Sequence, residues 1–104
     1  MDTKTANKKK IGISDIQVNV NRRFFECIDT LMKSKKLQSF YEFCQNEDHI
    51  SMGRYYEMKT EFGADTEIRP SRYKTIEMEA IHKLVTEYNV NARWLITGIG
   101  EMFD

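Results

Sequence analysis

The sequence predicts an all-α fold, a bundle of five helices with a flexible basic arm at its N-terminus. Only one proline and five glycines occur in 104 residues, so long runs are free of helix breakers. Apolar side chains recur through most of the chain at the three- and four-residue spacing of amphipathic helices. Hydrophobic residues make up 40% and charged residues 31% of the chain, a balance typical of one globular domain with a modest core.

The N-terminal end of the chain predicts an arm rather than a folded element. Residues 1–10 (MDTKTANKKK) are lysine-rich and have no apolar periodicity. Residues 11–20 (IGISDIQVNV) alternate loosely between apolar and polar, which fits an extended lead-in or a short strand that pairs with another chain. We therefore assign residues 1–20 to the arm and lead-in and residues 21–104 to the helical domain.

The first helix is expected over residues 22–34. Asn21 precedes it, and its side chain is suited to capping an unpaired backbone N–H. Lysines follow at the C-terminal end, where positive charge is favourable. One buried stripe is expected from the spacing of Phe24, Phe25, Ile28, Leu31 and Met32.

Two short helices joined by a polar turn are expected next. Ser39 and Glu42 form a capping-box pattern at the start of the second helix, and residues 46–49 (NEDH) interrupt the apolar pattern. Ser51 is suited to cap a third helix of about ten residues, whose inward side chains are expected to be Tyr55, Met58 and Phe62. This arrangement is typical of a helix-turn-helix.

The remainder of the chain predicts a long loop and two further helices. Residues 63–74 contain Gly63 and the one proline and read as a loop. A fourth helix is expected over residues 75–88, and a short fifth helix follows Asn91 and stops at Gly98.

Charge is distributed unevenly along a chain whose net charge is zero. Residues 1–36 carry nine Lys or Arg against four Asp or Glu, whereas residues 37–104 carry seven against twelve. A basic arm supplies the sequence-independent attraction to phosphates that nucleic-acid binding requires. The alternative is a solvated tail with no partner.

The C-terminal segment, residues 91–103 (NARWLITGIGEMF), resembles the end of the DNA-binding domain of phage-repressor regulators, the lambda-repressor-like family. Those domains close with an Asn, a Trp-Leu pair, Thr-Gly-x-Gly and an acidic residue followed by Met. Weaker resemblance reaches back to about residue 21, where Glu42-Phe43-Cys44 is similar to the family's Glu-Phe-Ala and Ile50-Ser51 to the pair that opens its recognition helix. Cys44 departs from the usual alanine, and the turn is one residue longer and lacks glycine.

The resemblance implies which residues contact DNA. Gln38 and Ser39 would contact phosphate at the start of the second helix, and Arg69, Arg72 and Lys74 would do so after the recognition helix. The alternative for these three cations is a solvated loop. The implied base contacts, on the third helix, are Ser51, Met52, Gly53, Arg54, Tyr56 and Lys59.

The resemblance therefore implies a sequence-specific transcriptional regulator, a repressor of phage or mobile-element type that binds double-stranded DNA as a homodimer. Dimerisation is expected from Met102 and Phe103, or from residues 11–20. The alternative is a protein–protein interaction module, anti-repressor or antitoxin-like, that keeps the helix-turn-helix scaffold without binding DNA.

Other function classes have little support in the sequence. Cys27 and Cys44 lie in apolar patterns and are expected to be core thiols. The alternative, a zinc site with His49 and His82, lacks the usual ligand spacing. Trp94 is assigned to packing rather than to base stacking. We expect a cytoplasmic protein with no enzymatic activity, metal or other cofactor, and no membrane span.

Overall fold

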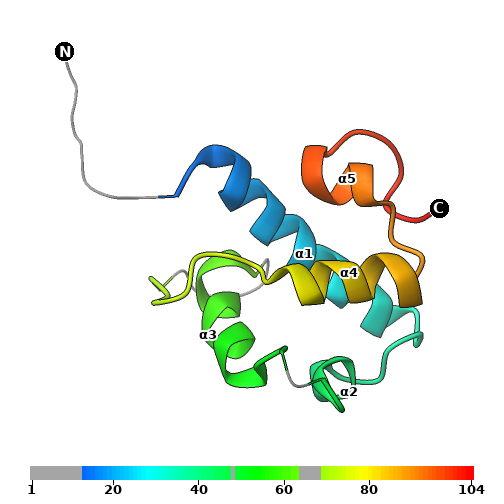
Figure 1. Cartoon of the computed structure of the whole chain (residues 1–104), viewed down its shortest axis with the longest axis horizontal. Helices are drawn as coiled ribbons and strands as arrows, with labels where there is room; N and C mark the ends of the chain where they lie inside the picture. The colour runs from blue at the N-terminus through cyan, green and yellow to red at the C-terminus, as the bar shows by residue number, and fades with distance from the viewer. Residues whose placement is uncertain (1–12, 48, 64–68) are drawn as a thin grey trace.

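The computed structural model describes residues 13–47, 49–63 and 69–104, which form an all-α bundle (Figure 1). No strand occurs among these residues; an isolated bridge joins Val90 to Phe103. Nor does any helix among them combine the length and apolar character needed to cross a bilayer. The arm expected over residues 1–10 lies outside the described residues. The five helices are α1 (Asp15–Lys33), α2 (Phe40–Cys44), α3 (Met52–Phe62), α4 (Met78–Glu87) and α5 (Ala92–Thr97).

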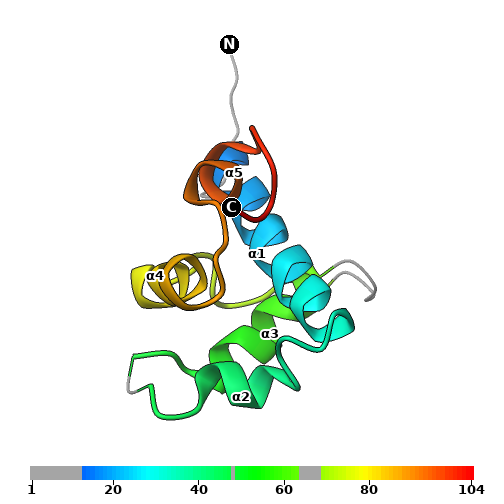
Figure 2. The same cartoon turned by 90° about the vertical axis from the view of Figure 1, so that its right-hand side faces the viewer.

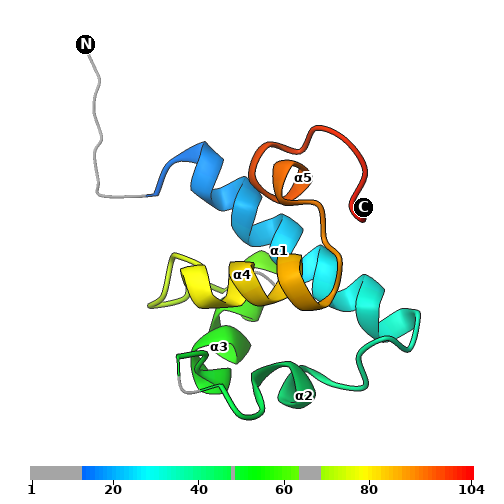
Figure 3. The same cartoon turned by 45° about the vertical axis from the view of Figure 1, so that its right-hand side comes forward.

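The helices are arranged around the long α1. Helix α5 packs against α1 at one end of the molecule, and α2 and α3 lie together at the opposite end (Figure 1 and Figure 2). Helix α4 lies between these two ends in all views, including the intermediate one of Figure 3. Arg23 ties α5 to α1, because its Nε and Nη2 donate to the carbonyls of Leu95 and Ile96 at 2.8 and 2.9 Å.

Helix α1 begins seven residues earlier than the sequence predicts. The extended lead-in predicted over residues 11–20 is therefore wrong for residues 15–20, which are helical. The Ser14 side chain caps the helix by accepting from the Gln17 N–H at 3.1 Å, and Asp15 lies in the first turn. Asn21 is not a cap, because it lies in the middle of α1. Its side chain is buried and donates to the carbonyl of Lys74 at 2.8 Å. The predicted boundary at residues 20 and 21 therefore falls within a continuous helix.

The predicted apolar stripe of α1 faces the core, where an aromatic cluster joins α1 to α2 and α3. The ring of Phe24 lies 6.0 Å from that of Phe43 and 5.4 Å from that of Tyr55, measured between centroids. Phe40 completes the cluster at 5.7 Å from Phe43. Such ring pairs contribute beyond their buried area, so α2, only five residues long, is held mainly by its aromatic side chains.

Helices α2 and α3 begin where the sequence predicts, because their caps are local. Ser39 accepts from the Glu42 N–H at 3.1 Å, and Ser51 accepts from the Arg54 N–H at 3.3 Å. The capping box differs in one detail: the Glu42 carboxylate accepts from the N–H of Gln38, one residue before the cap, at 2.6 Å.

Helix α4 starts three residues later than predicted because its first turn is used for contacts with α3. The Glu77 N–H donates to the Tyr55 hydroxyl at 2.9 Å, and the Thr75 carbonyl accepts from Arg54 at 2.7 Å. Ile76 is buried between them, before the helix begins. Helix α5 follows the prediction, with Asn91 as N-cap and Gly98 as a left-handed C-cap at φ 80°.

Candidate nucleic-acid interface

Helix α3 is buried on one side and partly exposed on the other. Tyr55, Met58 and Phe62 face the core, as predicted. With 3.6 residues per turn, Gly53 and Thr60 lie on the opposite side, next to Glu57. We call these last three residues the outer face of α3.

The predicted base-contact residues differ in how far their side chains are exposed. Ser51, the N-cap, is exposed, as are Gly53 and Lys59. Met52 is instead half-buried and packs against the core. Tyr56 is half exposed (51%) and its ring meets that of Phe40 edge-on at 5.8 Å.

Arg54 is turned along the side of α3 rather than outward. Its Nη2 donates to the carbonyl and hydroxyl oxygens of Thr75 at 2.7 and 3.1 Å, and its guanidinium lies 4.9 Å from the centre of the Tyr73 ring. Its Nε is buried with no hydrogen-bond partner among the described residues. Arg54 therefore fastens the segment before α4 to α3.

The segment 69–75 runs beside the outer face of α3 and is fixed to it at both ends. The Arg69 N–H donates to the carbonyl of Thr60 at 3.0 Å. Further along, Lys74 pairs with Glu61, Nζ to Oε1, at 2.6 Å. Burial works against the charged form of Glu61, but hydrogen bonds from Lys74 and the Ser71 N–H outweigh it and lower the pKa of the carboxyl group.

Arg72 and Glu57 form the central contact between this segment and α3. The Glu57 carboxylate accepts from the Arg72 Nη2 at 2.9 Å and from the Arg72 backbone N–H at 2.7 Å. These hydrogen bonds lower the pKa of Glu57, which therefore stays ionised. Two of the three predicted phosphate contacts in this segment, Arg72 and Lys74, thus already have carboxylate partners on α3.

The positive charge of this surface exceeds its negative charge despite these pairs. We call residues 52–62 and 69–75 together the α3–loop surface; it contains five Lys or Arg and two Asp or Glu, and the sequence between its two parts adds Asp65 and Glu67, which lie outside the described residues. The two carboxylates are those bound by Arg72 and Lys74. The other cations of this surface are Arg54, Lys59 and Arg69, in a chain whose net charge is zero.

The predicted phosphate site at the start of α2 is shared with a carboxylate. Ser39 uses its hydroxyl oxygen to cap α2, and Gln38 is exposed with its N–H bound to Glu42. A phosphate at this helix end would have to replace the carboxylate of Glu42.

Helix α4 is tied to the end of α2 and to the turn that follows it. The Lys83 ammonium, buried on α4, donates to the carbonyl of Phe43 at 2.8 Å and to the Glu47 carboxylate at 3.1 Å. The same ammonium lies 5.3 Å from the centre of the Phe43 ring. Nothing in the sequence singles out this lysine, because it lies within the apolar pattern of the fourth helix and its partners are distant in the chain.

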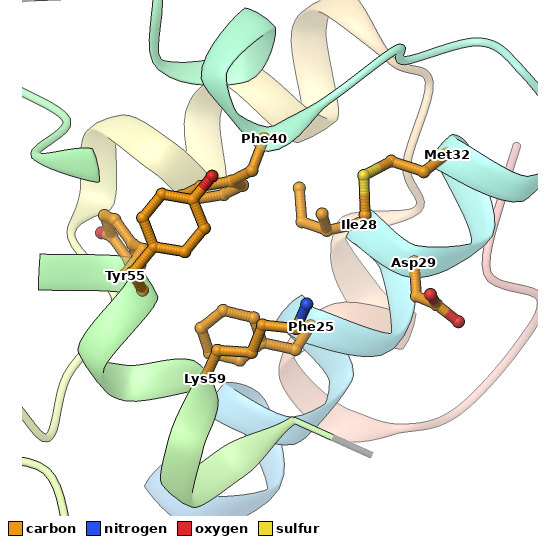
Figure 4. A pocket seen from close by; sticks show the side chains of 8 residues that line it. Phe25, Ile28, Asp29, Met32, Phe40, Tyr55 and Lys59 are labelled. Carbon is orange, nitrogen blue, oxygen red and sulfur yellow. The ribbon is translucent and has the colours of Figure 1, made fainter. Parts of the chain in front are cut away.

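A small apolar pocket opens where α1, α2 and α3 meet (Figure 4). Figure 4 shows aromatic and aliphatic side chains from all three helices around it. The residues that line it are Phe25, Ile28, Asp29, Met32, Phe40, Tyr55, Tyr56 and Lys59.

The predicted dimer residues Met102 and Phe103 are half-buried within the chain. The carbonyl of Met102 accepts from the Asn91 N–H at 2.8 Å, and Phe103 bridges to Val90 and lies under the Lys36 ammonium, 5.9 Å from the ring centre. The C-terminal segment therefore packs back onto the start of α5.

Cys27 and Cys44 are buried free thiols, as predicted. Burial raises the pKa of Cys27 to about 12 and that of Cys44 to about 11. Among the described residues, no group of three or more His, Cys, Asp or Glu side chains is placed to hold a metal ion.

Comparison of the chain with family models, curated proteins and solved structures gives no match.

Proposed function

We propose that this protein is a sequence-specific transcriptional regulator that binds double-stranded DNA by inserting α3 into the major groove. The observation that carries the proposal is the α2–turn–α3 unit, in which α3 lies at one end of the bundle with Gly53 and Lys59 exposed. An α-helix fits the major groove, where each base pair presents a distinct pattern of donors and acceptors. The similarity of residues 91–103 to phage-repressor domains supports the same function and favours a repressor.

The charge of the α3–loop surface supports this proposal. Residues 52–75 carry five Lys or Arg against four Asp or Glu, and Arg54, Lys59 and Arg69 lie on or beside the helix that would enter the groove. Phosphates flank both edges of the groove, so cations beside the helix would position it while the outer face reads bases.

A homodimer on a two-fold symmetric site follows from the size of the domain. One helix of eleven residues contacts few base pairs, and two copies on neighbouring half-sites raise specificity. We place the dimer contact at the C-terminal end, where Ile96 and Ile99 are exposed (43% and 54%) near the half-buried Met102 and Phe103.

Salt-dependent binding of the full chain tests the proposal. DNA selected from a random pool would be titrated with the protein at several salt concentrations by fluorescence anisotropy. Affinity is expected to fall steeply with salt, and Lys59→Ala or Arg69→Ala is expected to reduce the slope of log K against log salt by about 1 each.

Arg93→Ala is the matched control, because Arg93 is exposed on α5 at the other end of the bundle. It makes the same charge change and is expected to leave the slope unaltered. Affinity that does not respond to salt would contradict DNA binding.

The second candidate is a protein–protein interaction module on the same scaffold. It is favoured by the pairing of Arg72 and Lys74 with Glu57 and Glu61, which occupies cations that would otherwise meet phosphate. The salt titration separates the two functions, because an interaction module would show no steep salt-dependent affinity for DNA.

A further inference from the structure

We propose that Arg72 reads a guanine base, held by Glu57 so that one edge of its guanidinium is presented to the major groove. This inference rests on the proposed function and adds to it a specificity-determining residue outside the helix. Arg72 was expected from the sequence to contact phosphate, and its geometry in the fold points to a base instead.

Glu57 fixes Arg72 through several hydrogen bonds to one edge of the guanidinium. The Arg72 Nε lies 3.2 and 3.1 Å from the two carboxylate oxygens, and Nη2 lies 2.9 Å from Oε1. The backbone N–H of Arg72 adds a fourth contact, at 2.7 Å from Oε2. The ring of Tyr73 lies 5.2 Å from the guanidinium carbon and restrains it further.

The edge of the Arg72 guanidinium that Glu57 leaves open is the one suited to guanine. A guanidinium has five N–H donors in a planar fork, and Glu57 occupies the edge formed by Nε and Nη2. The edge formed by Nη1 and Nη2 is left, on a side chain that is 77% exposed. Two parallel donors match the O6 and N7 acceptors of guanine, the commonest specific contact of arginine with DNA.

The location of the pair supports base contact. Glu57 belongs to the outer face of α3, four residues after Gly53, where an added Cβ would meet nothing within 4 Å. Arg72 therefore extends the surface of α3 at the part of the helix that stands furthest from the core. A side chain already held in place also loses less rotamer entropy on binding than a mobile one.

Charge favours guanine over phosphate as the partner of Arg72. The adjacent Glu57 carboxylate cancels the charge of the guanidinium, and it would repel an anionic phosphate brought to the same place. The acceptors of guanine are neutral, so they gain the two hydrogen bonds without that repulsion. A phosphate contact would suit Arg69, which is exposed in the same segment.

Site selection from random DNA with the full chain tests this inference. Wild type is expected to select a half-site with at least one fixed guanine, and Arg72→Ala is expected to lose that preference and to keep the others. At that position, 7-deazaguanine removes the N7 acceptor and is expected to weaken wild-type binding by roughly 5-fold or more, with no effect on Arg72→Ala.

Two further variants separate base reading from charge. Glu57→Gln releases Arg72 and removes a negative charge, so affinity for random DNA should rise while discrimination for guanine falls. Arg69→Ala is the matched control and should keep the guanine preference. Thermal melting of each variant checks that the fold is retained.

The outcomes distinguish this inference from the proposed function. If wild type selects a site and Arg72→Ala keeps every guanine preference, or weakens all sequences equally with a lower salt slope, Arg72 contacts phosphate or nothing and the inference fails. If wild type selects no sequence, DNA recognition itself fails and this inference fails with it.

Discussion

The ammonium of Lys83, on α4, donates to the main-chain carbonyl of Phe43, at the end of α2, over a distance of 2.8 Å. Lys83 is buried, and its ammonium also donates to the Glu47 carboxylate in the turn that follows α2. One side chain from a distant helix thus fixes the end of α2 and the start of the turn before α3.

Replacing Lys83 by methionine is expected to destabilise the protein by about 1.5–3 kcal/mol, because a buried carbonyl loses a charged hydrogen-bond donor. Methionine keeps most of the apolar stem, so packing changes little. Urea unfolding would measure the difference. Lys35→Met, at an exposed position, is the control and should stay within about 0.5 kcal/mol of wild type; an equal effect of the two substitutions would contradict the role of Lys83.

The hydroxyl of Tyr55 makes a second link, between α3 and the start of α4. It donates to the Glu77 carboxylate at 3.0 Å and accepts from the Glu77 N–H at 2.9 Å, and Tyr55 is fully buried. Tyr55→Phe leaves that N–H unsatisfied, so we expect a loss of about 1–3 kcal/mol in the free energy of unfolding.

Tyr56→Phe is the matched control, because residue 56 is half exposed and its hydroxyl is not part of this link. Chemical denaturation would compare the two variants. Equal stability of Tyr55→Phe and wild type would show that water replaces the hydroxyl at no cost.

The start of α1 shows where sequence reasoning fails. Ser14 and Asn21 are both suitable caps, and the apolar residues between them fit two periods. The choice is made by a contact over 53 positions, from the Asn21 side chain to the carbonyl of Lys74. Ser14, Ser39 and Ser51 all cap with N–H groups three residues away, so each cap is a local signal; at α1 the sequence could not show that Asn21, the second candidate, is used for a long-range contact instead.

The same distinction holds for the candidate site. Helical spacing predicted that Tyr55 is buried and that Gly53 is exposed, because both follow from the period of α3. It could not pair Arg72 with Glu57 across 15 positions, since nothing local distinguishes Arg72 from Arg69. Nor could it turn Arg54 toward Thr75, which depends on the path of the chain before α4.

The two cysteines predict how stability depends on pH. Burial raises the pKa of Cys27 to about 12 and of Cys44 to about 11, from an ordinary thiol value of 9.0. The unfolded chain therefore loses its thiol protons first as pH rises. The two thiols add stability below about pH 9, and this contribution is lost progressively as the pH rises from about 9 to 11 for Cys44 and from about 9 to 12 for Cys27.

Thiol labelling at mildly alkaline pH tests the burial of the two cysteines directly. Both thiols should react slowly with a thiolate-directed reagent in the folded protein and quickly in denaturant, because the thiolate is the nucleophile. Cys44 should react before Cys27, since it is 8% exposed and Cys27 is 0% exposed. Rapid labelling of the folded protein would contradict the burial of both.

Gly53 links the stability of α3 to its proposed role. An added Cβ at this position meets nothing within 4 Å inside the protein, and alanine is favoured over glycine in a helix by up to about 1 kcal/mol. Gly53→Ala is therefore expected to raise the melting temperature. If the outer face of α3 approaches base edges closely, the same methyl group should weaken binding to the selected DNA.

Gly98→Ala is the control for the stability half of this prediction. Gly98 has φ +80°, and a Cβ there would lie 3.0 Å from the Arg23 Nη1. Alanine in the left-handed region costs about 1–2 kcal/mol, so this variant should melt at a lower temperature. Relative to wild type, Gly53→Ala should thus be more stable and should bind DNA more weakly. Unchanged DNA affinity would mean that the backbone near residue 53 stays clear of the groove. Melting curves and anisotropy titrations on both variants measure the two effects separately.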